Sequence, residues 1–195
     1  EIVPVAGVTS DVYSRALSPR LAQRAPLLAG SVSLVSTAVE ADGAALCVVV
    51  SEQVAARLQP AFALTCNGYQ TAGADSRLPG AAPVTVIRRL FERYPQFDPR
   101  LCVTEMMEAY AAQAIVCIRE SGLTAANVNL GGGALARGHP IGASGTILLC
   151  RLFHELRRHR QQQGVCAIAA AGGIGSAMLL SRWNRPAISS MTGLP

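Results

Sequence analysis

The residue best suited to chemistry is His139, which lies in the glycine-dense run GGGALARGHPIGASG at positions 131–145. Glycines let backbone approach a ligand closely, and Pro140 fixes φ where a helix can begin. A helix that begins there presents free N–H groups and the positive end of its dipole. A histidine at such a point can act as a base or as a hydrogen-bond donor to a developing negative charge. The run therefore predicts a catalytic or binding turn directly before a helix.

The elements that must position this turn are strands alternating with helices. Apolar runs predict strands at 44–50, 61–69, 101–104, 165–171 and 176–181. Helical spacing predicts helices at 51–58, 83–93, 108–121 and 142–161. Two successive strands near the end imply a mixed sheet covered by helices, which is an α/β fold. We expect 1–29 to be the end of a loop or connecting region, 30–183 to be the domain, and 184–195 to be a tail.

Length and composition restrict the class of protein. The 195 residues suit one domain, or a domain with a long arm, and the scarcity of aromatic residues predicts a core of Ala, Val, Leu and Ile. No apolar run reaches the roughly 20 residues that a membrane span needs, and the first residues do not form a signal peptide. We therefore expect a cytoplasmic protein without a membrane span. Because the chain begins at Glu1 and not at Met, we expect a fragment, a processed product or an expressed segment.

The net charge of +5 comes from arginine alone, since the sequence contains no lysine. Basic residues are not interleaved with aromatic ones, so we expect no nucleic-acid partner. The densest cluster is late in the helix expected at 142–161 and consists of Arg151, Arg157, Arg158 and Arg160. We expect this cluster to be a solvated face near the negative end of the helix dipole. The alternative is a site for an acidic cofactor such as coenzyme A.

The cysteines predict neither a metal site nor disulfides. All six lie in apolar neighbourhoods and none forms a C-x-x-C pair: Cys47, Cys66, Cys102, Cys117, Cys150 and Cys166. This pattern argues against zinc and favours buried free thiols in a reducing compartment.

Four blocks of sequence carry a resemblance to a known family. They are VSTAVEADGAA at 35–45, EMMEAYAAQ at 105–113, the Gly-His-Pro run around His139, and AAAGGIGSAM at 169–178. In order and at compatible spacing, they resemble the C-terminal half of the thiolase superfamily, which includes acetyl-CoA acetyltransferases and 3-ketoacyl-CoA thiolases. The similarity runs from about position 30 to position 182. It implies a βαβαβαββ half with a mixed five-stranded sheet covered by helices.

The resemblance implies a role for His139 and the need for a second component. His139 matches the histidine that activates the family's nucleophilic cysteine and helps hold the thioester oxyanion. Gly138 and Gly142 would let backbone pass close to the thioester. The cysteine belongs to the family's first half, which nothing here matches, so we expect an N-terminal half or a partner chain to supply it, within a homo- or hetero-oligomer. A coenzyme A thioester would be a substrate, with no permanently bound cofactor. The alternative for His139 is a capping or core histidine.

Two positions depart from the family pattern. The cysteine that moves a proton at the α-carbon aligns with Ala169, and a methyl group cannot do so. The asparagine of an oxyanion hole aligns with Met107, which offers no donor. Cys166 lies three residues before Ala169, on the opposite face of a strand, and is a poor substitute. Ala171 could still offer its backbone N–H to the oxyanion.

Other positions matched to the family are candidate substrate contacts. Ser36 and Ala38 occupy an altered pantetheine-contacting segment, while Ala109 and Tyr110 would line the acyl pocket. Tyr110 could equally pack against the sheet. We expect Glu108 to cap or begin the helix at 108–121. We expect His154 and His159, on the arginine-rich helix, to face water.

Three hypotheses follow. The first is a thiolase-like acyltransferase subunit, acting in fatty acid or ketone metabolism, that transfers acyl groups from acyl-CoA or an acyl carrier through a cysteine outside this chain. The second is a catalytically degenerate structural partner in a heterodimer. The third is an active thiolase in which Ala169 is an engineered change. Because an isolated half would expose apolar faces, we expect the chain alone to aggregate or to be unstable.

Overall fold

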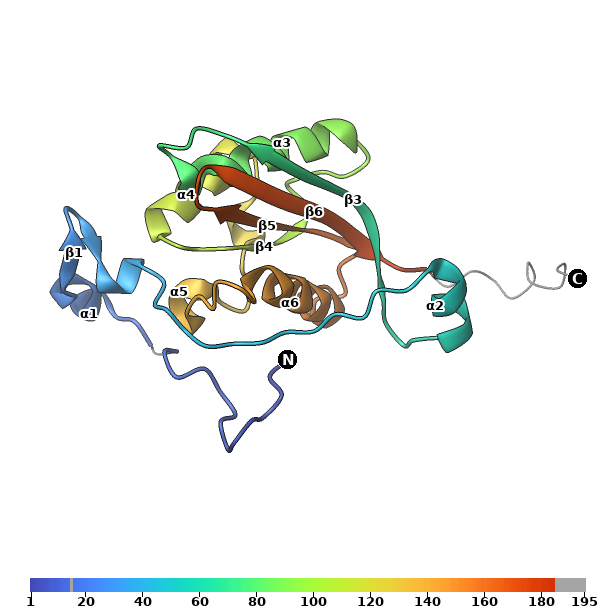
Figure 1. The fold of residues 1–195 in the computed structure, drawn as a ribbon, viewed down its shortest axis with the longest axis horizontal. Coiled ribbons are helices and arrows are strands. Elements are labelled where there is room, and N and C mark those ends of the chain that lie inside the picture. Colours follow the sequence, from blue (N-terminus) through green and yellow to red (C-terminus); the bar gives the residue numbers. More distant parts are fainter. Residues whose placement is uncertain (15, 185–195) are drawn as a thin grey trace, which may run out of the picture.

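The main body is a mixed sheet between two layers of helices (Figure 1), seen in a computed structural model that describes residues 1–14 and 16–184. The strand order is β3 (Leu64–Gly73), β6 (Ile174–Arg182), β5 (Gln163–Ala170) and β4 (Val103–Met106). β6 is antiparallel to both neighbours, and β4 is parallel to β5. The predicted α/β fold with a mixed sheet is confirmed.

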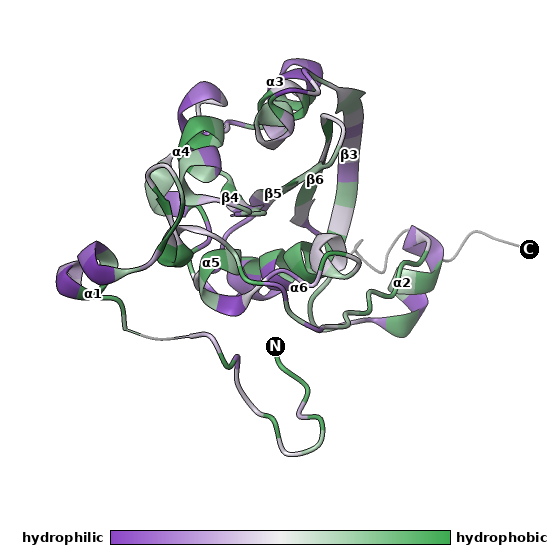
Figure 2. Ribbon diagram, turned by 60° about the vertical axis from the view of Figure 1, so that its left-hand side comes forward, coloured by the Kyte–Doolittle hydropathy of each residue, from purple (hydrophilic) through white to green (hydrophobic). Residues whose placement is uncertain are grey.

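The helices cover both faces of this sheet (Figures 1 and 2). α3 (Ala82–Arg93) and α4 (Ala111–Glu120) lie on one face, and α5 (Ala134–Arg137) and α6 (Ser144–Arg158) lie on the other. Alternate side chains of β5 divide between two cores, since Val165 packs with Leu90 of α3 while Cys166 packs with Leu152 of α6. β5 is therefore apolar on both faces, as in a sheet with two covered sides.

The chain follows the βαβαβαββ order, although one of its strands is a single bridge. The sequence resemblance implies five strands, and the described residues form four in this sheet. Beyond β4, Val128 makes a parallel bridge with Thr104, and the Asn129 N–H donates to the Thr104 carbonyl at 2.8 Å. Asn129 then takes a left-handed conformation, with φ of +49°, which turns the chain away from the sheet and ends the pairing.

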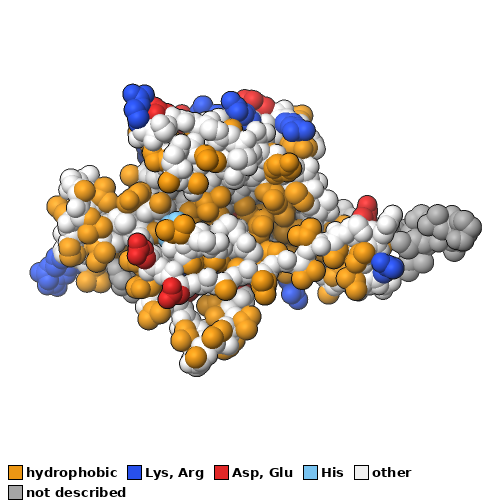
Figure 3. Space-filling model, viewed as in Figure 1, with side chains coloured by type: hydrophobic (Ala, Val, Ile, Leu, Met, Phe, Trp, Pro, Cys, Tyr) orange, Lys and Arg blue, Asp and Glu red, His pale blue; other side chains and the backbone are white. Residues whose placement is uncertain are grey.

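The prediction of a strand at 44–50 was wrong. This segment is extended, yet it belongs to no strand and runs past α6 towards α2 (Glu52–Leu58), as Figure 1 shows. Leu46, Val48 and Val49 are 93%, 89% and 91% exposed. The apolar run predicted a covered strand, but no strand in the described part of the chain pairs with it. Figure 3 shows exposed hydrophobic side chains along the extended chain that leads to α2.

The expected connecting region at 1–29 contains some regular structure. α1 (Pro19–Arg24) begins after Ser18, whose Oγ accepts from the Leu21 N–H at 3.3 Å. β1 (Leu27–Ala29) and β2 (Val32–Ser33) then form a separate antiparallel pair, followed by a 3₁₀ turn at Leu34–Ser36. The predicted tail at 184–195 lies outside the described residues after Asn184. Within the described ranges, no helix has the length and hydropathy that crossing a membrane requires.

The expectation of buried cysteines is only partly confirmed. Cys102, Cys117 and Cys166 are buried, whereas Cys47 and Cys66 are exposed and Cys150 is half-buried. Cys47 lies in the uncovered segment at 44–50, so its apolar neighbours do not hide it. All six are free thiols.

Candidate active site

His139 lies in the turn between α5 and α6, held by a segment almost one hundred residues earlier in the chain. Its backbone N–H donates to the Val39 carbonyl at 2.7 Å, and Glu40 and His139 form a parallel bridge. Gly138 has φ of +94°, and a Cβ there would lie 2.7 Å from Ala41 Cβ and 3.2 Å from the Val39 oxygen. Only glycine meets both the conformation and the close approach that place His139.

The ring of His139 is oriented by Ser144, the first residue of α6. His139 Nδ1 lies 2.7 Å from Ser144 Oγ, which in turn lies 3.0 Å from the Pro140 carbonyl. Because a carbonyl oxygen can only accept, the hydroxyl donates to Pro140 and accepts from Nδ1–H. The neutral ring then carries its lone pair on Nε2, and Nε2 is the nitrogen that can take a proton.

Burial lowers the pKa of His139 from its ordinary value of 6.5, because the half-buried site disfavours the charged ring. The histidine is therefore neutral at neutral pH and is ready to act as a base. The direction of this shift and the hydrogen bond to Ser144 agree, since both present an unprotonated Nε2.

Two more of the predicted segments meet at the same place. The Ala38 N–H donates to the Ala109 carbonyl at 3.0 Å, and Thr37 bridges Tyr110. The segment at 37–40 therefore connects the residues after β4 to the turn of His139. Ser36 instead closes its own 3₁₀ turn, where Oγ accepts from the Ser33 N–H at 2.9 Å.

Met107, Ala169 and Ala171 lie at or just beyond the ends of the parallel strands β4 and β5. The Met107 N–H donates to the Ala167 carbonyl at 2.9 Å, and the Met107 side chain is buried in the core with Ala134 of α5. Ala169 pairs with Gly175 near the end of β5, and Ala171 is exposed in the turn that follows. The carboxyl ends of parallel strands share one edge of a sheet, so the structure gathers these positions on one side.

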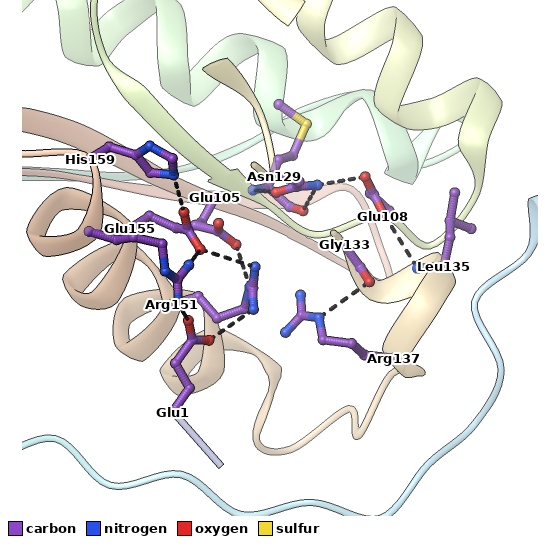
Figure 4. A network of polar contacts seen from close by, with 12 residues as sticks. Glu1, Glu105, Glu108, Asn129, Gly133, Leu135, Arg137, Arg151, Glu155 and His159 are labelled. Atoms are coloured by element: carbon purple, nitrogen blue, oxygen red, sulfur yellow. Dashed lines mark hydrogen bonds and ion pairs between the residues drawn. The ribbon is translucent and has the colours of Figure 1, made fainter. Parts of the chain in front are cut away.

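Glu108 has a different role from the predicted one. α4 begins at Ala111, and Glu108 does not begin or cap it. Its Oε2 accepts from the Leu135 N–H of α5 at 3.3 Å, and its Oε1 accepts from Asn129 Nδ2 at 2.6 Å (Figure 4). Glu108 therefore supports the N-terminus of the short helix that leads into the turn of His139, where a carboxylate is favourable.

Asn129 is a positioning residue that the sequence analysis missed. Its Oδ1 accepts from the Met106 N–H at 2.8 Å, and its Nδ2 donates to the Met106 carbonyl at 3.0 Å as well as to Glu108. It thus fixes the backbone that leads into Met107. The available signal was an asparagine shortly before three glycines, because asparagine tolerates left-handed backbone and bonds to nearby peptide groups.

The arginine-rich end of α6 corrects a further prediction. Arg151 does not belong to a solvated face, because it is 8% exposed and lies in a buried ion network (Figure 4). Its Nε is 3.0 Å from Glu105 Oε2, its Nη1 is 3.0 Å from Glu1 Oε2, and Glu155 lies one turn along the helix. These carboxylates form ion pairs with the Arg151 guanidinium. The pairing disfavours the alternative of a coenzyme A site at that residue. Arg157, Arg158 and Arg160 are exposed, as expected.

His154 lies on α6, and His159 is the residue directly after the last turn of that helix. His159 is 44% exposed and its Nε2 lies 3.1 Å from Glu155 Oε2. His154 is half-buried, so the prediction that it faces water is only partly met. Neither contacts the turn of His139 through a hydrogen bond within the described residues.

Two hollows on the surface lie among other residues than the candidate site. One, of about 360 Å³, is bounded by residues 60–63 and 182–184, and the other, of about 330 Å³, by residues 69–71, 93 and 94. Among the described residues, no group of three or more His, Cys, Asp and Glu side chains could hold a metal ion. His139 itself is half-buried.

The family model described as "Thiolase, C-terminal domain" matches residues 61–182. The chain belongs to the thiolase family. It is 35% identical over 179 residues to an acetyl-CoA acetyltransferase of Pseudomonas aeruginosa, in a match that covers 92% of this chain and 44% of that protein. It is 38% identical over 197 residues to the 3-oxoadipyl-CoA/3-oxo-5,6-dehydrosuberyl-CoA thiolase of Escherichia coli, in a match that covers 93% of this chain and 49% of that protein.

A solved thiolase structure confirms the fold. The acetyl-CoA acetyltransferase of Bacillus anthracis superposes with a TM-score of 0.84 at 29% identity, covering 89% of this chain and 45% of that one. This thiolase-family chain therefore spans about half the length of the relatives that it matches, and it corresponds to their C-terminal half.

Proposed function

We propose that this chain is the half of a thiolase-type acyltransferase that carries the activating histidine. The observation that supports the proposal most directly is the hydrogen bond of His139 Nδ1 to Ser144, which leaves Nε2 free to accept a proton. A thiol attacks a thioester well only as a thiolate, so a neutral histidine beside it performs a needed step.

In the proposed reaction, a cysteine outside this chain loses its proton to Nε2 of His139. The thiolate attacks the carbonyl carbon of an acyl-CoA, and coenzyme A leaves as its thiol after it receives that proton. The acyl group then passes from the cysteine to an acceptor, whose proton His139 takes in turn. The backbone N–H of Ala171, together with the histidine, is the candidate donor to the oxyanion.

Ala169 and Met107 restrict the acceptor. Neither side chain can move a proton, and the Met107 side chain is buried in the core with Ala134. A step that removes a proton from the α-carbon of an incoming acyl-CoA therefore has no group to perform it in this half. We propose transfer to an acceptor with its own acidic proton, or condensation with a donor that decarboxylates.

The segment at 44–50 is the proposed docking element for the remainder of the enzyme. It is extended and apolar on both sides, as strands covered on both faces are, and the described chain offers no neighbouring strand for it. The family relatives contain about as many further residues as this chain has. We propose that the segment adds as a strand to a sheet in the N-terminal half or in a partner chain, which also supplies the cysteine.

A second candidate is a structural partner without catalysis of its own. The buried, donor-free Met107 and the methyl group of Ala169 favour it, because two polar positions of the site have lost their chemistry. The His139–Ser144 hydrogen bond favours the enzyme. The two candidates differ in whether an acyl group is held covalently by the assembly.

The test is intact-mass spectrometry of the assembly that contains this chain, after incubation with acetyl-CoA and with longer acyl-CoAs. We expect an acyl adduct on a cysteine outside residues 1–195, formed much more slowly in the His139→Ala variant. His154→Ala is the matched control, since His154 lies on α6 away from the site contacts, and it should acylate at the wild-type rate. No adduct with any acyl-CoA or acyl carrier would leave the structural-partner function.

A further inference from the structure

Two thiols from distant parts of the chain lie next to each other beside α6. Cys47 Sγ and Cys150 Sγ are 3.6 Å apart, although 103 positions separate them in sequence. Cys150 Sγ also lies 3.6 Å from the Leu46 carbonyl. Cys47 belongs to the extended segment at 44–50, and Cys150 is in the second turn of α6.

The pair is close because the chain from Val39 to Cys47 follows the turn of His139 and then α6. The Val39 carbonyl accepts from the His139 N–H. Four residues later, a Cβ on Gly43 would lie 2.8 Å from Pro140 Cγ and 3.7 Å from Ile147 Cδ1. Four residues further, Cys47 reaches Cys150. The contact between the thiols is thus the third of three contacts, at positions 39, 43 and 47, that hold this segment along the turn of His139 and α6.

We propose that Cys47 and Cys150 form a reversible disulfide that fastens the extended segment to α6. The oxidant is a small disulfide such as oxidised glutathione. The Cys47 thiolate attacks one glutathione sulfur, and one glutathione leaves as its thiol. The Cys150 thiolate then attacks the Cys47 sulfur of the mixed disulfide, which releases the second glutathione. Two cysteine thiols lose two protons and two electrons, and one oxidised glutathione becomes two thiols.

The surroundings permit the bond with little rearrangement. A disulfide is about 2.05 Å long, so the sulfurs must approach by about 1.5 Å. Between positions 41 and 50, the described chain makes no backbone–backbone hydrogen bond that would resist this movement. In the chain before the segment at 44–50 docks, Cys47 is exposed to an incoming disulfide, while Cys150 is half-buried. This arrangement assigns the first attack to Cys47 and the second to Cys150.

The remaining thiols, including Cys150, are less suited than Cys47 to the first attack on glutathione disulfide or serve as controls. Burial raises the pKa of Cys150 to about 11, with Cys47 adding to the shift, so the Cys150 thiolate is scarce and its attack relies on the closeness of the mixed disulfide on Cys47. Burial raises the pKa of Cys166, which lies fully buried on β5, well above its ordinary value. Cys66 is exposed on β3 and serves as a control for simple glutathione attachment.

The bond would hold the chain on both sides of the histidine turn. Val39 and Glu40 already contact His139 at one end of the segment, and the disulfide would fix its other end on the helix that Ser144 begins. This inference concerns residues within the chain and does not rest on the proposed acyl transfer.

The experiment equilibrates residues 1–195 in glutathione buffers of graded ratio, blocks remaining thiols with N-ethylmaleimide, and measures intact mass and unreduced peptide maps. We expect the covalent mass of one chain with two fewer maleimides, and a peptide that links Cys47 to Cys150. Cys47→Ser and Cys150→Ser should each abolish that peptide, whereas Cys66→Ser should leave it unchanged. Circular dichroism shows whether each variant remains folded.

A second readout is thermal unfolding of the oxidised chain. Because the cross-link closes a long loop of the unfolded chain, the oxidised wild type should melt several degrees above the reduced form, and Cys47→Ser should show no such difference. The proposal is overturned if Cys66 acquires glutathione in a buffer where Cys47 and Cys150 remain unlinked. Linkage of Cys47 to a cysteine of another molecule would overturn it equally.

Discussion

At the scale of single residues, the site depends on how His139 is held. Its backbone is held by Val39, and its ring orientation and tautomer are held by Ser144. The matching of sequence blocks identifies the histidine, but it does not identify the serine that selects the tautomer.

Replacing Ser144 with alanine should slow acylation of the partner cysteine by about five- to tenfold, because one hydrogen bond of about 1 kcal/mol no longer orients the ring. Mass spectrometry of samples quenched at successive times measures the acylation rate. Thr146→Ala, also on α6, is the control and should acylate normally. An unchanged rate in Ser144→Ala would show that the serine does not position the base.

The pH dependence of acylation should follow the lowered pKa of His139. Since burial favours the neutral ring, the rate should decline as pH falls, with a midpoint below 6.5. A pH–rate profile measures the midpoint, and NMR titration of the ring protons assigns it. A midpoint at or above 6.5 would contradict the buried, neutral base.

At the scale of elements, the turn between α5 and α6 needs glycine at one position and tolerates a side chain at another. Gly138→Ala should lower the free energy of unfolding by about 1–3 kcal/mol, because alanine is strained at a φ of +94° and its Cβ would meet Ala41 and Val39. A Cβ on Gly142 would meet no atom within 4 Å, so Gly142→Ala is the matched control and should unfold like wild type. Chemical denaturation compares them, and equal losses in both would count against this account of the turn.

The buried ion network between β4 and α6 should make stability depend on pH. Burial raises the pKa of Glu105 to about 7, although Arg151 opposes the shift. Between the unfolded value of 4.5 and about 7, the folded chain binds more protons than the unfolded chain, so this group's contribution is full below 4.5 and is lost as pH rises through 7. Urea denaturation at graded pH should show less decline in Glu105→Gln than in wild type.

Glu120→Gln provides the control for that measurement, because Glu120 pairs with Arg88 at the surface. Exposed pairs contribute little to stability, so this variant should follow the wild-type pH profile. A Glu105→Gln profile as steep as that of wild type would assign the dependence to other groups.

At the scale of the whole molecule, residues 1–50 carry more than half of the exposed large apolar side chains in the described chain. Large apolar side chains are exposed from Ile2 to Val50, whereas the two cores of the sheet are closed. The chain alone should therefore associate as its concentration rises. Leu46→Asp combined with Val48→Asp should reduce this association in analytical ultracentrifugation, without lowering the melting temperature.

Leu78→Asp is the control for these two substitutions, because Leu78 is 64% exposed but lies in the loop before α3. It should leave the association unchanged. A wild-type chain that remains monomeric at all concentrations and unfolds in one sharp transition would contradict the proposed docking role of the segment at 44–50.

Much of the fold could be predicted because local pattern and tertiary role agree. The periodicity of Val86, Ile87 and Leu90 predicted α3, whose observed bounds differ from the prediction by one residue at its start. The segment at 44–50 misled the prediction for a physical reason. An apolar run indicates that a strand is covered, but it does not indicate which part of a protein covers it.

By itself, the sequence determined the family and the order of the helices and strands that form the main sheet and its helical layers, and it singled out His139 as a candidate, because residue types and local spacing carry that information. Only the tertiary structure decided that Ser144 directs Nε2, that Arg151 is buried among carboxylates, and that Cys47 lies beside Cys150. Each of these contacts depends on which side of an element faces a neighbour or on segments far apart in the chain. Burial and long-range contacts arise only when the elements pack, so no local pattern could have shown them.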